Sequence, residues 1–168
     1  SLPISEDTPN NPQSPYAWQK SAVEDAAILF CKLYDIDIVS LRYFNVFGPG
    51  QLGDSAYSTA VSAWCNNTKT SRPLRSDGDG TQSRDMCYID NVVDANIKAA
   101  ISKPKASFGG ECYNIACGDR VSNNQILEYF QKRFKYAVVK SAPWRQGDVM
   151  HTQANINKAK RDLGYDPK

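Results

Sequence analysis

The stretch Ser14-Pro15-Tyr16-Ala17-Trp18-Gln19-Lys20 opens a run that predicts a helix to about Tyr34. Residues at positions i and i+4 of a helix lie one above the other, so this spacing places the Tyr16 phenol beside the Lys20 ammonium. A nearby cation favours the phenolate form, and a phenol tuned in this way can exchange protons with a hydroxyl group. Because the spacing alone is common by chance, its meaning depends on the segments around it.

Strands and helices alternate on the carboxyl side of this helix. Residues 1–15 hold four prolines and predict an extended loop. Strands are predicted over 36–42, near Leu74, and over 85–89, 111–116 and 136–140. Helices are predicted over 55–66, from an Asp90 N-cap to about 102, from Ser122, and over 157–163. This order of elements predicts an α/β fold.

The apolar periodicity assigns an inner face to two of these helices. In the first helix we expect the small and apolar side chains to be buried and Glu24 and Lys32 to be outside. The expected buried residues are Ala22, Ala26, Ala27, Leu29, Phe30 and Leu33. In the helix from Asp90, we expect Val93, Ile97, Ala100 and Ile101 to point inward.

Length and composition exclude several classes of protein. A chain of 168 residues allows one domain, or one lobe and part of another, and 41% hydrophobic content supports a core. A net charge of +2 with scattered basic residues argues against a nucleic-acid surface. The sequence has no apolar run near the ~20 residues of a membrane span, and neither end has the features of a signal peptide.

The sulfur and imidazole side chains predict no metal site. Five cysteines lie singly, without metal-ligand spacing, which predicts structural thiols in a reducing compartment and a cytoplasmic location. His151 is the single histidine and has no cysteine or carboxylate partner at ligand spacing.

Three segments together resemble a known family. They are S-P-Y-x-x-x-K at 14–20, L-R-Y-F-N-V-F-G-P at 41–49 and D-G-x-x-S-R-D-x-x-Y-I-D-N-V at 79–92. This set resembles the extended short-chain dehydrogenase/reductase superfamily, its NAD-dependent nucleotide-sugar epimerases and dehydratases, and among these the UDP-N-acetylhexosamine 4-epimerases. The resemblance covers only the carboxyl-terminal half of such an enzyme, because the G-x-x-G-x-x-G turn that holds the dinucleotide pyrophosphate does not occur.

The resemblance implies a division into two parts. Residues 1–50 and about 84–104 would form the last strands and helices of a Rossmann-type parallel sheet. Residues about 51–83 and 105–168 would form a small mixed α/β lobe that binds the nucleotide sugar. The helix from Tyr16 would form a homodimer interface, or the truncated chain would self-associate.

The resemblance also implies the chemistry. Such an enzyme passes the sugar C4 hydride to NAD, lets the ketosugar rotate and returns the hydride to the other face. Tyr16 would be the base, with Lys20 tuning it and binding the nicotinamide ribose. Tyr43 and Phe44 would border the cofactor, with the Phe44 backbone on the nicotinamide carboxamide. Asn45 would hold the sugar or its diphosphate.

The remaining substrate contacts are assigned from the same resemblance. Arg84 and Arg145 would clamp the diphosphate, because a planar guanidinium can hold two phosphate oxygens at once. Asp148 would bind the ribose hydroxyls. Trp64 would lie near the uracil, although core packing is the commoner role of a helical tryptophan.

Two residues concern the sugar 2-substituent. Thr152 is smaller than tyrosine and would leave room for an N-acetyl group to turn. Gln51 would lie near that group and favour substrates that carry it.

Two positions depart from the family pattern. Asp77 stands where an asparagine is common, and Arg75 stands where a tyrosine is common. A carboxylate near uracil or phosphate would repel negative charge unless it faces a hydrogen-bond donor. Both departures weaken the nucleotide-site assignment locally.

The sequence therefore predicts part of an NAD-dependent UDP-sugar 4-epimerase, inactive as the isolated chain. A related nucleotide-sugar decarboxylase or dehydratase is an alternative. The sequence upstream of Ser1 would distinguish these enzymes from an epimerase. A non-catalytic nucleotide-sugar-binding module is a second alternative, which should bind UDP and ignore NAD.

Overall fold

The computed structural model describes residues 1–55, 58–102, 108–145 and 147–168. Within these ranges the helices are α1 (Pro15–Tyr34), α2 (Ala60–Lys69), α3 (Ile89–Ile101), α4 (Asn123–Arg133) and α5 (Asn157–Leu163). The strands are β1 (Ile38–Tyr43), β2 (Asn45–Phe47), β3 (Leu74–Asp77), β4 (Ser83–Arg84), β5 (Met86–Tyr88), β6 (Gly109–Ile115), β7 (Val121–Ser122) and β8 (Val139–Ala142).

The first helix begins and ends at residues whose chemistry favours those positions. The Ser14 side chain accepts a hydrogen bond from the Ala17 N–H at 3.1 Å, and Pro15 occupies the first helical position. At the other end Asp35 adopts the left-handed conformation with φ 51°. The predicted helix over 16–34 is confirmed, beginning one residue earlier.

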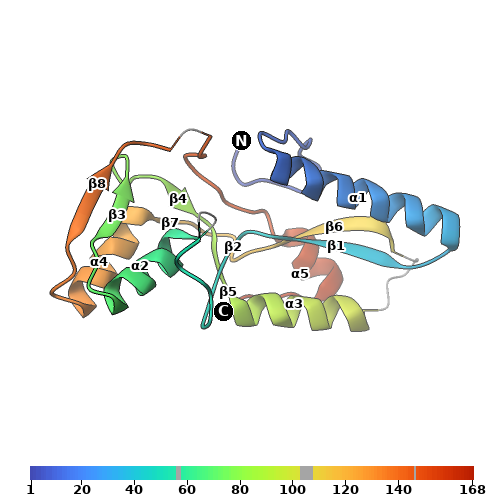
Figure 1. Cartoon of the computed structure of the whole chain (residues 1–168). Helices are drawn as coiled ribbons and strands as arrows, with labels where there is room; N and C mark the ends of the chain where they lie inside the picture. Colours follow the sequence, from blue (N-terminus) through green and yellow to red (C-terminus); the bar gives the residue numbers. More distant parts are fainter. Residues whose placement is uncertain (56–57, 103–107, 146) are drawn as a thin grey trace.

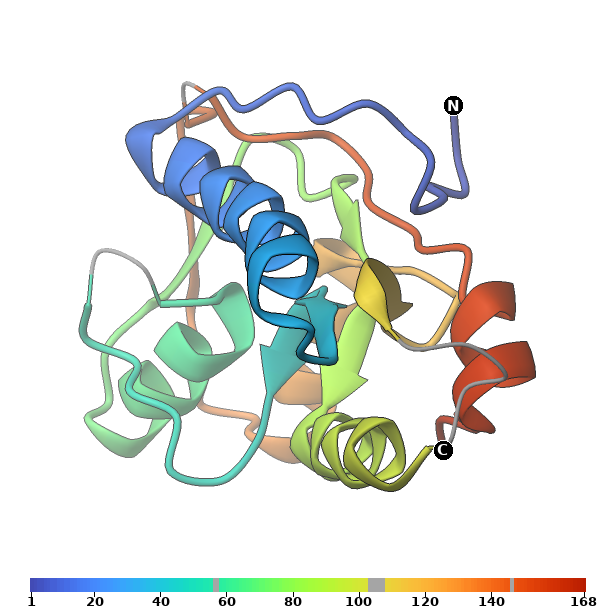
Figure 2. The same cartoon turned by 90° about the vertical axis from the view of Figure 1, so that its right-hand side faces the viewer.

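Parallel strands form the central layer, with helices on both faces. β1 pairs in parallel with β6, and after Phe44 the chain continues into β2, which pairs in parallel with β5. α1 covers one face of β1 and β6, while α3 and α5 cover the other (Figure 1 and Figure 2). The helices and the sheet enclose a core that includes Ala95, Ile115 and Tyr165. This layering confirms the α/β fold with parallel strands.

A smaller lobe is built from β3, β8, α2 and α4. β3 and β8 pair in parallel, and the lobe has its own core of Trp64, Leu74 and Leu127 (Figure 1). β4 and β7 form a short antiparallel pair that lies between the lobe and the central layer in Figure 1. The structure places β6 and α5 with the central layer, although residues 105–168 were assigned to the lobe. The assigned boundary at 104–105 falls outside the described residues.

The predicted inner face of α1 is largely wrong. Ala27 is buried, but Leu29, Phe30 and Leu33 are exposed, and Glu24 lies against β1 in an ion pair with Arg42. The helix carries apolar side chains around most of its circumference, so periodicity did not identify the face that contacts the strands. The same applies to α3, where Val93, Ile97 and Ile101 are exposed and the buried residues are Asn91, Val92, Ala95 and Ala99.

Two helix starts also differ from the prediction. α3 begins at Ile89 after Tyr88, so Asp90 lies in its first turn and is not its N-cap. α2 begins at Ala60, where the Thr59 side chain accepts a hydrogen bond from the Ser62 N–H at 3.4 Å. Residues 56–57 of that predicted helix lie outside the described part of the chain.

Candidate functional site

The Tyr16 and Lys20 side chains lie together at the exposed start of α1. The Lys20 Nζ lies 5.5 Å from the centroid of the Tyr16 ring, and the tyrosine is 61% exposed. The i and i+4 spacing therefore brings a cation to the phenol as the sequence predicted. The first turn of α1 and the segment after β8 lie on the same side of the molecule in both views (Figure 1 and Figure 2).

The junction between β1 and β2 carries the next three candidate residues. The Tyr43 hydroxyl donates to Asn96 Oδ1 on α3 at 3.0 Å. The Phe44 N–H donates to the Ile115 carbonyl at 3.1 Å, so a backbone contact with a cofactor falls to the Phe44 carbonyl. The Asn45 side-chain oxygen accepts a hydrogen bond from the Thr152 hydroxyl at 3.4 Å.

The Arg145-Gln146-Gly147-Asp148 segment presents two further candidates. The Asp148 N–H donates to the Arg145 carbonyl at 3.2 Å, so the two residues lie close together. Arg145 Nε lies 2.7 Å from Asp77 Oδ2, and Arg84 Nη2 lies 2.6 Å from Asp148 Oδ1. These two ion pairs connect Arg145 to β3 and Asp148 to β4.

Arg84 is more enclosed than Arg145. Its Nη1 donates to the carbonyls of Ser83 at 3.0 Å and Met150 at 3.1 Å, and its side chain is 14% exposed. The Arg145 side chain is 52% exposed. Of the two predicted phosphate clamps, Arg145 is therefore the one open to an incoming anion.

The segment that carries Thr152 is held against β4. The Thr152 N–H donates to the Ser83 carbonyl at 3.0 Å, and the Thr152 hydroxyl accepts from the Asp85 N–H at 3.3 Å. His151 Nδ1 lies 2.9 Å from the Ser83 hydroxyl oxygen. The segment thus places Thr152 between Asp85 and Asn45.

Asp85 is a positioning residue that the sequence analysis did not single out. Its carboxylate is fully buried and accepts three backbone hydrogen bonds, from Cys117 at 2.8 Å and from Gly118 and Ala154 at 3.0 Å each. Burial raises the pKa of this carboxyl, and the three N–H donors oppose that shift. Asp85 ties the loop after β6 to the segment after Thr152. Its place directly after Arg84 in the S-R-D motif was the available signal.

Gln51 and Trp64 have different surroundings. Gln51 Nε2 donates to the Val46 carbonyl at 3.1 Å and borders a cavity of about 250 Å³ beside Ile89. Trp64 is 1% exposed, and its indole N–H donates to the Arg75 carbonyl at 2.7 Å. Its ring packs edge-on against Phe130, so Trp64 has the core role that was weighed against a place near the uracil.

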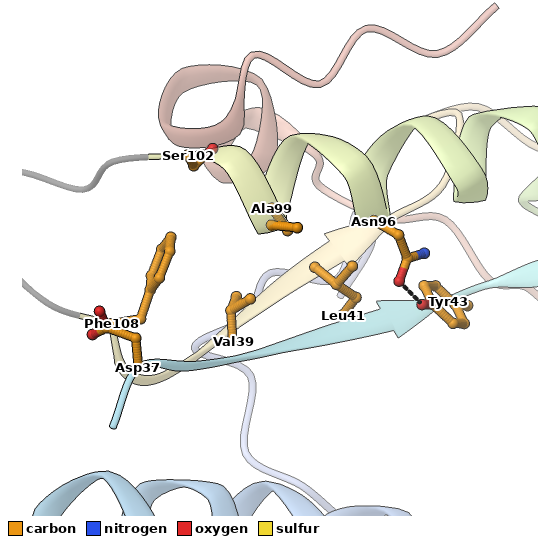
Figure 3. A pocket seen from close by; sticks show the side chains of 9 residues that line it. Asp37, Val39, Leu41, Tyr43, Asn96, Ala99, Ser102 and Phe108 are labelled. Atoms are coloured by element: carbon orange, nitrogen blue, oxygen red, sulfur yellow. Dashed lines mark hydrogen bonds between the residues drawn. The ribbon is translucent and has the colours of Figure 1, made fainter. Parts of the chain in front are cut away.

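A cavity of about 400 Å³ lies between β1 and α3 (Figure 3). Val39, Leu41 and Tyr43 point into it from the strand, and Ala99 borders it from the helix. Of the predicted site residues, Tyr43 alone lines this cavity. Neither Arg84 nor Arg145 borders this cavity.

Comparison with known proteins identifies the family. The family model described as NAD dependent epimerase/dehydratase family matches residues 1–116. The chain belongs to this family. It is 35% identical, over 95% of its own length and 47% of the relative's, to a UDP-glucuronate 4-epimerase of Thermodesulfobacterium geofontis.

Solved structures of this family superpose closely on the chain. A UDP-N-acetylglucosamine 4-epimerase from Methanobrevibacter ruminantium M1, in complex with UDP-N-acetylmuramic acid, gives a TM-score of 0.91 at 32% identity. That match covers 99% of this chain and 52% of the other. A UDP-glucose 4-epimerase from Thermotoga maritima with UDP-glucose gives 0.90 at 30% identity, covering 100% and 53%.

The chain spans about half the length of the curated relatives it matches. For the NAD of this family, the chain offers an exposed phenol and ammonium at Tyr16 and Lys20 and the Phe44 carbonyl, which suit the nicotinamide end. The glycine-rich turn for the pyrophosphate end is not in this sequence. Among the described helices, none is long and apolar enough to cross a membrane.

Proposed function

We propose that this chain supplies the nucleotide-sugar site and the proton-transferring tyrosine of an NAD-dependent UDP-sugar 4-epimerase. The observation that supports this most strongly is the grouping of Arg145, Asp148 and Arg84. A backbone hydrogen bond brings the candidate phosphate ligand Arg145 beside the candidate ribose ligand Asp148. An ion pair joins Asp148 to Arg84, the second candidate phosphate ligand, on β4. Relatives at about 30% identity or more act, by name, on UDP-glucuronate, UDP-glucose and UDP-N-acetylglucosamine.

In this proposal, each residue of the chain has a defined task. Arg145 holds the diphosphate through its exposed guanidinium, and Arg84 joins it when the ligand takes over from Asp148. Asn45 orients the sugar. Tyr16 moves the proton of the 4-hydroxyl, with the Lys20 ammonium over its ring. Bound NAD supplies hydride acceptance and return.

We propose that the favoured sugars carry an N-acetyl group. Thr152 leaves more space beside Asn45 than a tyrosine would, and the Gln51 amide can hydrogen-bond to an acetamido oxygen. A site with such a polar group discriminates against substrates that leave it unpaired. Substrates without the N-acetyl group are therefore expected to be poorer.

We also propose that the chain self-associates through α1, as a homodimer. The apolar side chains exposed on this helix support that proposal, because large exposed apolar patches usually mark interaction sites. They include Trp18, Val23, Leu29, Phe30, Leu33 and Tyr34.

Titration calorimetry with UDP tests the nucleotide site on this chain directly. We expect the parent to bind UDP and Arg145→Ala to bind it about tenfold more weakly, the cost of one charge-assisted contact. The matched control is Arg161→Ala, which removes an exposed arginine on α5 and should leave affinity unchanged. A parent without UDP binding, or an equal loss in both variants, would contradict the proposed function.

A further inference from the structure

The two positions that depart from the family pattern meet in the structure. Asp77 ends β3, and its carboxylate receives two arginines. Its Oδ1 lies 2.6 Å from Arg75 Nε, and its Oδ2 lies 2.7 Å from Arg145 Nε. The Asp77 side chain is 15% exposed, whereas the arginines are 54% and 52% exposed. We call these three residues the Asp77 cluster.

Asp77 engages the inner edge of the Arg145 guanidinium. A guanidinium has one N–H on Nε and four on its terminal nitrogens, in a rigid planar fork. Asp77 contacts Nε, and the described residues form no hydrogen bond to the terminal nitrogens of Arg145, which can therefore receive two oxygens of an anion. Asp148 instead contacts a terminal nitrogen of Arg84, so it competes with an anion for that arginine.

The Asp77 cluster also offsets the negative charge that Asp77 brings to the site. A carboxylate alone beside a diphosphate would repel it. Here two guanidinium groups and one carboxylate leave a net charge of +1. Arg75 therefore offsets the charge of Asp77, and Arg145 keeps its attraction for an anion.

The backbone around Asp77 is fixed in several ways. The Asp77 carbonyl accepts a hydrogen bond from Gln82 Nε2 at 2.8 Å, and the Gly78 N–H donates to the Ala142 carbonyl at 2.9 Å. Gly78 has φ +62°, and a Cβ placed on it would lie 2.7 Å from the Trp144 ring. The Trp144 indole therefore packs directly on Gly78. This contact keeps the residue that precedes Arg145 beside the end of β3.

We propose that Asp77 is a positioning residue that orients Arg145 toward the diphosphate of the nucleotide, with Arg75 as its charge partner. This inference rests on the proposed function, because it takes the ligand to be a nucleoside diphosphate. The two unusual residues then strengthen the site that they were expected to weaken.

A double-mutant cycle on the full chain, with UDP as the probe, tests this inference. We expect Asp77→Asn to weaken UDP binding about tenfold, because the neutral amide no longer orients the Arg145 guanidinium through an ion pair. In the Arg145→Ala background the same substitution should have no further effect, since the residue it positions is gone. UDP is titrated into the millimolar range so that weak binding is measured. Asp162→Asn, which breaks a carboxylate–arginine pair on α5, is the matched control and should bind UDP like the parent.

A purely structural role of Asp77 would give a different result. General damage to the lobe would weaken UDP binding equally in both backgrounds and lower the melting temperature. Additive losses in the double-mutant cycle would overturn this inference, and so would unchanged or tighter UDP binding by Asp77→Asn. If the parent still binds UDP in these cases, the proposed function stands. A parent that does not bind UDP overturns both.

Discussion

The substitution Glu24→Gln should loosen the attachment of α1 to β1. Glu24 on α1 binds Arg42 on β1 through two hydrogen bonds, from Arg42 Nε to Oε1 at 2.7 Å and from Nη2 to Oε2 at 2.6 Å. Arg42 Nη1 also donates to the Glu6 carbonyl at 3.1 Å. This pair joins the helix that begins near Tyr16 to the strand that ends at Tyr43.

The size of the effect follows from the burial of the pair. The side chains of Arg42 and Glu24 are 23% and 17% exposed. Breaking a fully buried pair costs about 3–5 kcal/mol, and an exposed pair contributes about 0–1 kcal/mol. We therefore expect Glu24→Gln to lower the free energy of unfolding by about 2 kcal/mol near neutral pH.

The pH dependence gives an independent check. The Arg42 hydrogen bonds are the largest influence on the Glu24 carboxyl, and they hold its pKa below the usual range for glutamate. A lowered pKa in the folded state means that the pair stabilises the protein above the unfolded pKa. The stabilisation is lost as the pH falls through the folded value. The difference between parent and Glu24→Gln should therefore shrink as the pH falls below about 4.3, the usual pKa of a glutamate side chain.

Urea unfolding followed by circular dichroism measures both quantities. The control is Asp94→Asn, which breaks the half-exposed i, i+4 pair Asp94–Lys98 on α3 and should cost about 0.3–0.5 kcal/mol. A loss in Glu24→Gln no larger than in the control would refute the reasoning. A difference that persisted undiminished in acid would refute it as well.

Three further predictions concern the site and the surface. In an enzyme restored by adding the front half of a relative, Lys20→Met should weaken NAD binding and lower kcat, measured by titration and turnover, and an effect on neither would remove Lys20 from the site. In the same enzyme, Thr152→Tyr should abolish conversion of UDP-N-acetylglucosamine and spare UDP-glucose, judged by kcat/KM; equal losses for both would contradict the role of Thr152. The isolated chain should self-associate in light scattering, and Leu33→Glu should shift it toward monomer; a monomer at all concentrations would exclude the α1 interface.

The sequence predicted the elements better than their orientation. The Ser14-Pro15 signal located the start of α1 within one residue, because capping and proline geometry are local properties. The buried faces of α1 and α3 were mispredicted, because both helices carry apolar residues around most of their circumference. Periodicity identifies a face only where the opposite face is polar.

The candidate site was predicted in part. The spacing of Tyr16 and Lys20 determined their contact, since both lie on one helix. The pairs of Arg145 with Asp77 and of Arg84 with Asp148 join residues more than 60 positions apart, and they depend on how β3, β4 and β8 are arranged. The burial of Trp64 could be predicted from the sequence, because core packing is the commoner role of a tryptophan on a helix.

The measurement that most directly tests the epimerase proposal is sugar interconversion by the restored enzyme. Proton NMR would follow UDP-N-acetylglucosamine with bound NAD, for the parent and for Tyr16→Phe. The proposal predicts that the parent forms UDP-N-acetylgalactosamine. It also predicts that Tyr16→Phe binds the substrate but is slower by about 10²–10⁴-fold, the usual loss when a general base is removed. A folded parent that binds both NAD and the UDP-sugar yet forms no epimer, or a Tyr16→Phe variant as fast as the parent, would contradict it.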